Sequence, residues 1–256
     1  MKIIINCDDL GESTFINDRI LDLMEAGRVT SATLLMNGPA VDDAVRRIGR
    51  YPHMSFGVHL NVTQFRPLCS HPGLAPLLNE EGEFEGREKY GGNLRRMRLT
   101  TGIAEGIFAE WSAQIERALA LRIPVSHLDS HHFTHKIPSL FRVFKRVQKK
   151  YGISKIRITE NVFGVHKIVS PMRRAAGLAL NFAFRHYVQT KTTDGFCEFS
   201  TFHERLLAGL GWHGSIELMC HPGSNREEYS YDAALLYGNW REELAKDAKL
   251  ISYNEL

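Results

Sequence analysis

Histidine and aspartate residues stand out in this sequence because they follow short apolar runs. Asp8 and Asp9 follow the first such run, His59 lies within the run 57–63, four histidines and an aspartate fall within 127–135, and His221 precedes a Pro-Gly pair. Two adjacent ionised carboxylates repel each other, so they need a cation, a proton or open water. One Asp and two His form a common ligand set for a catalytic divalent metal ion. The pattern predicts a metal site with a second carboxylate beside it.

Each of these groups also has a simpler explanation. An Asp-Asp pair is typical of a turn or a helix cap, and His59 or His221 alone fits a buried, hydrogen-bonded histidine. Asp129 is equally well explained as a turn residue. The run 127–135 is harder to dismiss, although only one or two of its histidines can be ligands. Because every group follows a predicted strand, a metal site remains the favoured interpretation.

Short β-branched runs alternate with longer helical patterns along the chain. The predicted strands are Lys2–Cys7, Ser31–Met36, Ser55–Val62, Pro124–Leu128, Lys155–Thr159, Ser215–Cys220 and, more weakly, His186–Thr190. The predicted helices are Ser13–Ala26, Pro39–Arg50, Ala104–Leu121, Pro138–Tyr151, Pro171–Phe184, Thr201–Leu210 and Trp240–Ala248. This alternation predicts an α/β protein with a parallel sheet, open or closed. About seven strands without a GxGxxG turn favour a TIM-like barrel, whose strands present their carboxyl ends on one face.

Residues 64–101 interrupt this alternation. The segment is rich in Gly, Pro, Asn and Arg, and no other feature suggests a domain boundary or an internal repeat. Long loops in compact domains are often functional lids. We therefore expect a single domain over residues 1–256, with a lid or insertion loop at about 64–101.

Composition excludes several classes of protein. The chain has 256 residues, 43% hydrophobic content and a formal net charge of +3, and its basic residues are scattered. Nucleic-acid binding is not expected, because it calls for a concentrated basic surface. Four cysteines lie far apart with no CxxC spacing, which fits a reducing compartment. With no signal-peptide pattern and no apolar run of about 20 residues, we expect a cytoplasmic protein without a membrane span.

The motifs together resemble the YdjC-like carbohydrate deacetylases, a family that includes the chitooligosaccharide deacetylases. The segments that carry the resemblance are 8–11 (DDLG), 57–63 (GVHLNVT), 127–135 (HLDSHHFTH), 192–196 (TTDGF) and 217–223 (ELMCHPG). Their order and spacing agree with the family from the first strand to the last. The resemblance implies a distorted (βα)7 barrel that binds a divalent metal ion, Mg²⁺ or Zn²⁺, and removes N-acetyl groups from a small carbohydrate substrate.

The same resemblance implies which residues hold the metal. Asp9, His59 and His131 are the expected ligands, with His127 as the alternative to His131. Asp129 is expected to orient a ligating imidazole by accepting its other N–H, or to serve as a further ligand.

It also implies roles for residues in catalysis. Asp8 is expected to be the general base, and His221 the general acid by analogy with related polysaccharide deacetylases. Arg66, just after the third strand, is a candidate for contact with sugar hydroxyls or an acidic group. Aromatic candidates for sugar stacking, each equally explained as core, are Phe65, Tyr90, Phe133, Phe163 and Trp212.

Alternatives from other classes stay open at this point. The same metal chemistry serves hydrolysis of another amide, an ester or a phosphoester, and a non-catalytic carbohydrate-binding barrel would share the fold. The segment Lys167–Arg185 mixes apolar and basic residues, so it is either an ordinary barrel helix or a segment that lies on a membrane. The sequence allows a homodimer without requiring one.

Overall fold

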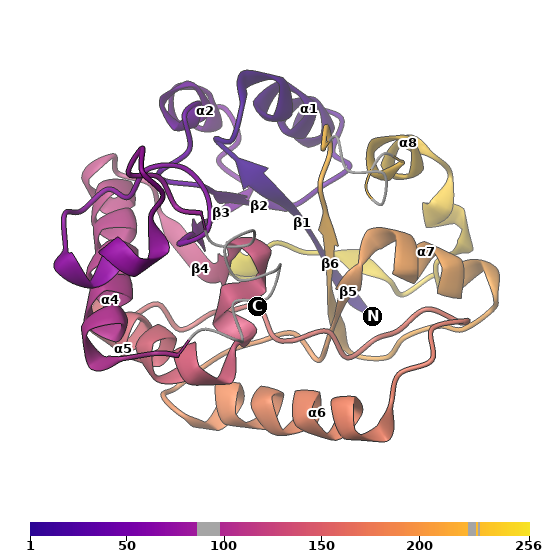
Figure 1. The fold of residues 1–256 in the computed structure, drawn as a ribbon. Helices are drawn as coiled ribbons and strands as arrows, with labels where there is room; N and C mark the ends of the chain where they lie inside the picture. The colour runs from indigo at the N-terminus through magenta and orange to yellow at the C-terminus, as the bar shows by residue number, and fades with distance from the viewer. Residues whose placement is uncertain (86–97, 225–228, 230) are drawn as a thin grey trace.

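A computed structural model of the protein describes residues 1–85, 98–224, 229 and 231–256, and within these ranges seven strands form one parallel sheet (Figure 1). The strands are β1 (Lys2–Leu10), β2 (Ser31–Leu34), β3 (Ser55–Leu60), β4 (Val125–Ser130), β5 (Gly195–Glu198), β6 (Ser215–Cys220) and β7 (Lys249–Leu250). Their order is β4-β3-β2-β1-β6-β5, and β7 pairs with β1. The predicted α/β class and parallel strands are confirmed.

The barrel is distorted where β4 and β5 fail to pair with each other. The irregular segment 154–162 lies between them: the Arg157 N–H donates to Leu128 O of β4, and the Asn161 N–H donates to Phe196 O of β5. The predicted strand Lys155–Thr159 therefore exists only as isolated bridges. The weaker prediction at His186–Thr190 is wrong, because this stretch is a helix end and a turn.

Helices cover the outside of the sheet, most of them close to the predicted positions. They are α1 (Thr14–Glu25), α2 (Val41–Ile48), α4 (Thr101–Ala120), α5 (Phe141–Tyr151), α6 (Pro171–His186), α7 (Phe199–Leu207) and α8 (Asp232–Tyr237). Local chemistry explains several boundaries: the Ser13, Thr100 and Ser170 side chains cap α1, α4 and α6, and Gly152 ends α5 with φ 65°. The predicted helix Trp240–Ala248 is shorter, a 3-10 turn over Trp240–Glu243.

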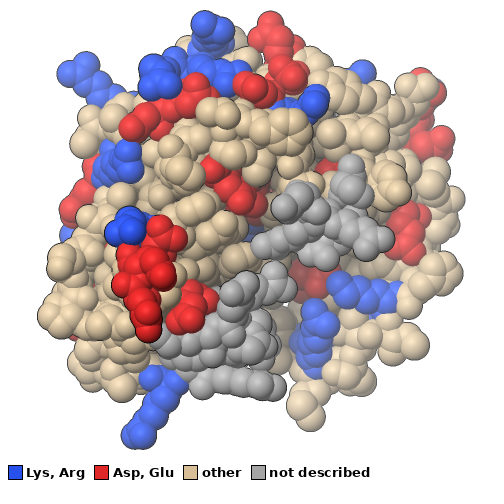
Figure 2. Space-filling model, turned by 45° about the horizontal axis from the view of Figure 1, so that its top comes forward, with Lys and Arg blue, Asp and Glu red and all other residues tan. Residues whose placement is uncertain are grey.

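The core lies between the sheet and these helices. Strand β1 is buried from Ile3 to Leu10, as expected for a central parallel strand covered on both faces. On the face in Figure 2, basic and acidic side chains are interspersed, which agrees with the scattered charge of the sequence. No helix in the described ranges is long and apolar enough to cross a membrane.

The first part of the predicted lid packs against α4. Leu74, Leu77 and Phe84 are buried in the core, and the Glu110 carboxylate of α4 accepts the N–H groups of residues 68 and 69. Residues 86–97, which include the candidate Tyr90, lie outside the described residues. The lid therefore stays a prediction.

Candidate metal centre and active site

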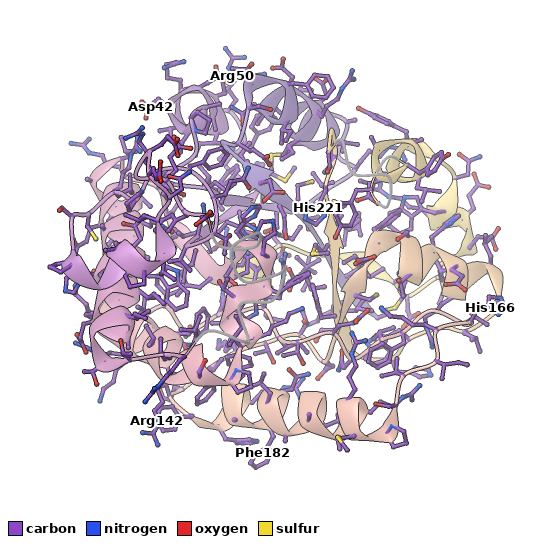
Figure 3. All side chains as sticks on the ribbon, in the orientation of Figure 1. Asp42, Arg50, Arg142, His166, Phe182 and His221 are labelled. Carbon is purple, nitrogen blue, oxygen red and sulfur yellow. The ribbon has the colours of Figure 1, made fainter. Side chains whose placement is uncertain are left out.

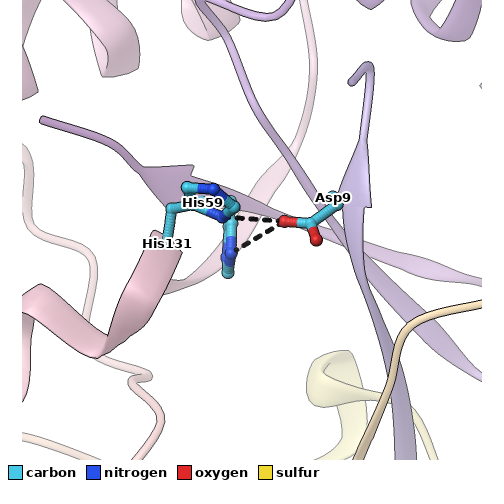
Figure 4. A group of neighbouring side chains, drawn as sticks. All are labelled: Asp9, His59 and His131. Carbon is cyan, nitrogen blue, oxygen red and sulfur yellow. Dashed lines mark ion pairs between the residues drawn. The ribbon is translucent and has the colours of Figure 1, made fainter. Parts of the chain in front are cut away.

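Asp9, His59 and His131 bring three potential metal ligands together where β1, β3 and β4 end (Figure 4). Asp9 Oδ1 lies 2.9 Å from His131 Nδ1 and 3.3 Å from His59 Nε2, and the three ligand atoms all lie within 4.8 Å of one another. Donor atoms that share one zinc-like ion at about 2.0–2.2 Å stand roughly 3 Å apart. The spacing therefore suits a divalent metal ion.

The backbone at Asp9 explains how two neighbouring aspartates reach the same site. In a regular strand, adjacent side chains point to opposite faces. Here the pairing of β1 with β2 is irregular between Cys7 and Leu10, and Asp9 has a left-handed backbone with φ 68°. Both Asp8 and Asp9 consequently line one cavity. A left-handed residue other than glycine costs about 1–3 kcal/mol, and such strain concentrates at functional sites.

Hydrogen bonds on the far sides of the two imidazoles decide which nitrogens face Asp9. The Asp129 carboxylate lies 2.7 Å from His59 Nδ1, and Gln64 Oε1 lies 2.8 Å from His131 Nε2. Because both partners accept a hydrogen bond from a ring N–H, the other nitrogens, His59 Nε2 and His131 Nδ1, face the buried Asp9 Oδ1 and carry a lone pair when the rings are neutral. Within the described part of the chain, that oxygen has no hydrogen-bond partner. Three lone-pair donors facing one another fit a cation, so these residues can hold a metal ion.

The pKa shifts at this site express the same electrostatics. Burial opposes ionisation of Asp9, but His131, His59 and His221 together outweigh it and hold the pKa of Asp9 well below its usual range. Burial opposes protonation of His59, but the Asp129 and Asp8 carboxylates raise its pKa to about 10. Asp9 therefore stays ionised, and the His59 nitrogen that faces it, Nε2, favours a positive charge, either a proton or the metal ion that would replace it.

Asp8 is held by a different cation. Its two carboxylate oxygens accept hydrogen bonds from Arg157 Nη1 and Nη2, each at 2.6 Å, and Oδ1 also accepts from Asn6 Nδ2 at 2.8 Å. Burial would raise the pKa of Asp8, yet Arg157 and His59 bring it well below its usual range. Asp8 is thus an ionised carboxylate fixed in one orientation.

Arg157 is the main functional residue that sequence reasoning missed. Besides Asp8, this fully buried guanidinium contacts Asp129 Oδ2 at 2.9 Å and Glu217 Oε1 at 2.7 Å. Since a positive charge already lies between Asp8 and Asp129, the second cluster of potential ligands, formed by these two residues and His59, is neutralised without a metal. The available signal was an arginine between two isoleucines in the predicted strand Lys155–Thr159. Gln64 was missed as well, because its role depends on a contact 67 residues away.

His221 follows β6 and lies beside the two carboxylates, near the middle of the view in Figure 3. Its Nε2 is 3.7 Å from Asp8 Oδ2 and 3.8 Å from Asp9 Oδ2. The ring stacks on Tyr229 with centroids 4.0 Å apart, and the backbone N–H of His221 donates to Asp232 Oδ2 at 2.7 Å. Burial lowers the pKa of the His221 imidazole, although the carboxylates of Asp9 and Asp8 act in the opposite direction.

His127, the alternative ligand, lies outside the Asp9–His59–His131 group. Its ring stacks on Tyr253 with centroids 3.6 Å apart and interacts with the Ser126 hydroxyl at 2.8 Å. Gly57 packs directly against the same ring, since a Cβ there would lie 2.6 Å from it. The geometry therefore groups His131, rather than His127, with the other two candidate ligands.

A cavity of about 830 Å³ opens above these residues. Asp8, Asp9, His59 and His221 are among its lining residues, and two of the aromatic candidates, Phe133 and Phe163, also line it. Arg66 is not among the described residues that line the cavity; its exposed guanidinium lies 3.4 Å from Glu83. The volume is within the range of small-molecule sites.

The fold is thus a parallel α/β barrel whose strand ends carry an Asp-His-His group able to hold a metal ion. The family model described as YdjC-like protein matches residues 2–248, and the chain belongs to this family. The chain is similar to a carbohydrate deacetylase of Halalkalibacterium halodurans (29% identity, covering 98% of this chain and 100% of that one). It is also similar to one from Vibrio campbellii (34% identity, 87% and 78%). In fold it resembles a crystal structure from Enterococcus faecalis V583, described as a candidate cellobiose-phosphate cleavage protein (TM-score 0.74, 22% identity, 99% and 98%).

Proposed function

We propose that this protein is a metal-dependent hydrolase that removes N-acetyl groups from an N-acetylated sugar or oligosaccharide of the chitooligosaccharide type. The observation that carries the proposal is the Asp9–His59–His131 group beside the Arg157-bound carboxylate of Asp8, on the lining of one cavity. The similarity of the chain to carbohydrate deacetylases supports the choice of a sugar amide as substrate. We also propose that residues 1–256 act as one domain, since strands from β1 to β6 contribute to the site.

Asp9, His59 and His131 would hold the divalent ion, which we propose to be Mg²⁺ or Zn²⁺. When bound, such an ion polarises a carbonyl group and lowers the pKa of water. Asp129 and Gln64 contribute by fixing the two imidazoles so that the ligating nitrogens face the centre.

Asp8 would act as the general base. It is ionised at neutral pH, and the bidentate contact with Arg157 keeps its carboxylate aimed at one place. His221 would act as the general acid, because its Nε2 lies within 4 Å of the Asp8 and Asp9 carboxylates at the end of the neighbouring strand β1. Asp8 would take a proton from the water that attacks the acetyl carbonyl carbon, and His221 would give a proton to the amine nitrogen as the C–N bond breaks.

The test is acetate release from N,N′-diacetylchitobiose by protein stripped of metal and reloaded with Mg²⁺, Zn²⁺, Mn²⁺ or Co²⁺. We expect metal-dependent release that is abolished by Asp8→Asn and kept by the matched exposed variant Asp42→Asn, whose side chain pairs with Arg117 at the surface. Release that is independent of metal or unchanged in Asp8→Asn would refute the mechanism.

Two other outcomes separate the alternatives. Stoichiometric metal binding with turnover only of another amide, ester or phosphoester would keep the metal centre and change the substrate. Sugar affinity without turnover, surviving Asp8→Asn, would identify a binding barrel. The cytoplasmic location and the homodimer stay predictions.

A further inference from the structure

Helix α6 exposes an apolar side that nothing in the described structure covers. One side of the helix is anchored: Asn181 and Phe184 are buried, and Asn181 exchanges hydrogen bonds with the backbone of Thr159. The opposite side carries Leu178 and Phe182, which are 62% and 65% exposed. In Figure 3 the Phe182 label lies below α6, on the side away from the sheet.

The apolar residues form a continuous stripe rather than scattered positions. At about 100° per residue, Met172, Ala175, Leu178, Ala179 and Phe182 fall within an arc of roughly 120° on the wheel of α6. The stripe continues before the helix at Ile168, which is 98% exposed. Of the thirteen exposed large hydrophobic side chains in the described residues, six lie within residues 165–187. Such concentration distinguishes a contact surface from the isolated exposed apolar residues of ordinary proteins.

The charge of this segment is entirely of one sign. Residues 161–193 contain five Lys and Arg residues and no Asp or Glu, although the chain has 29 acidic residues in all. Arg174 and Arg185 lie on one flank of the apolar stripe on the helical wheel, and Lys167 and Arg173 lie near its N-terminal end. Glu160, which lies 2.8 Å from Lys167 and 3.5 Å from Arg173, stands just before this stretch.

We propose that α6 and the residues leading into it dock on an anionic lipid bilayer, with the helix in the plane of the interface. An apolar face flanked by arginines is the pattern of interfacial helices, because the apolar side chains enter the acyl boundary while the cations meet anionic headgroups. A second copy of the chain is a poorer occupant. A two-fold interface places the same surface on both sides, so it would bring these basic residues against one another.

The docking surface continues into the cavity of the candidate active site. Met172, Arg173 and Leu180 of α6 line that cavity, whereas Leu178 and Phe182 do not. Docking would therefore place the α6 wall of the cavity at the membrane surface. This inference does not depend on the reaction proposed above, and it is tested by binding alone.

The experiment is co-sedimentation of the full chain with vesicles of phosphatidylcholine or of an equimolar mixture of phosphatidylcholine and phosphatidylglycerol. We expect binding to the mixed vesicles, little binding to phosphatidylcholine alone, and release by high salt, because exposed charge attraction is screened. The double variant Leu178→Glu/Phe182→Glu should bind about tenfold or more weakly, since two apolar anchors are lost and two repulsive charges gained. The matched control Leu207→Glu, which changes a residue of α7 that is 67% exposed, should bind like the parent.

Thermal unfolding of all variants checks that they fold. Absence of binding to the mixed vesicles, or equal binding by parent and double variant, would overturn the proposal. A concentration-dependent dimer in size-exclusion chromatography with light scattering that is abolished by the double variant would assign the surface to a second copy and would also overturn it.

Discussion

Replacing Arg157 by methionine tests whether the buried cation holds the site together. The guanidinium is fully buried and contacts three carboxylates, Asp8 at 2.6 Å, Asp129 at 2.9 Å and Glu217 at 2.7 Å. Methionine fills much of the same volume without charge, so the substitution mainly leaves buried carboxylates without their cation. Removing one partner of a buried ion pair costs about 3–5 kcal/mol. We expect the free energy of unfolding at pH 7 to fall by about that amount.

The assay is urea unfolding followed by circular dichroism and fluorescence, with excess EDTA so that metal binding does not contribute. The control is Arg146→Met, which removes a surface pair: Arg146 Nη1 lies 2.5 Å from Glu105 Oε1, and the two side chains are 52% and 44% exposed. Exposed pairs contribute about 0–1 kcal/mol. A loss in Arg157→Met no larger than the loss in Arg146→Met would refute the reasoning.

The pH dependence gives a second check on the same variant. Burial already raises the pKa of Glu217, and Arg157 opposes that rise. Without the guanidinium the pKa rises further, so folding takes up a proton that the unfolded chain releases above its ordinary carboxyl pKa. Stability of the variant therefore falls as pH rises, and its deficit is larger at pH 7 than at pH 5. Adding Glu217→Gln to Arg157→Met should recover part of the loss, and a deficit independent of both pH and Glu217 would contradict this account.

Other predictions follow from single contacts. Asp8→Asn should abolish acetate release but keep stoichiometric metal, whereas His59→Ala should lose the metal; metal content is measured by elemental analysis after desalting. Gly57→Ala should destabilise the fold by about 1–3 kcal/mol in urea unfolding, because the new Cβ would lie 2.6 Å from the His127 ring. Burial raises the pKa of Asp232 to about 7, so the folded state keeps a proton that the unfolded state loses from pH 3.8 upward. The free energy of unfolding should fall by up to about 4 kcal/mol as the pH rises from 3.8 to about 7. Asp232→Asn should remove this pH dependence, and substitutions at other sites should leave it in place.

The resemblance implied the three candidate ligands, and their convergence could be predicted from sequence because a parallel sheet places all carboxyl strand ends on one face. Asp9, His59 and His131 each follow or end a strand that was recognisable from its own apolar run. Their convergence then follows from topology, without knowledge of the register. The local backbone was beyond this reasoning, since the left-handed conformation of Asp9 has no signature in residue type.

The supporting residues were not predictable, because their partners are distant in the chain. Arg157 reaches Asp8 across 149 residues and Glu217 across 60, and neither spacing leaves a periodic signal. Strand β5 was missed because four residues, Gly195–Glu198, are too few to show alternation. The predicted strand near 190 failed for the opposite reason: its β-branched residues favour a strand, but α6 runs on to His186 and Val188 adopts φ 68°.

The structure divides two carboxylates that the sequence places side by side. Asp8 is neutralised by a cation that belongs to the chain, the guanidinium of Arg157, with both oxygens engaged. Asp9 faces only the ring nitrogens of His59 and His131 through an oxygen that is otherwise without a hydrogen bond in the described residues. The Arg157 guanidinium keeps Asp8 ionised and oriented whether or not a metal is bound, whereas Asp9 is free to bind a cation from outside the chain. The two carboxylates thus differ in how their charge is balanced, and this difference supports the proposal that Asp8 is the base and Asp9 the ligand.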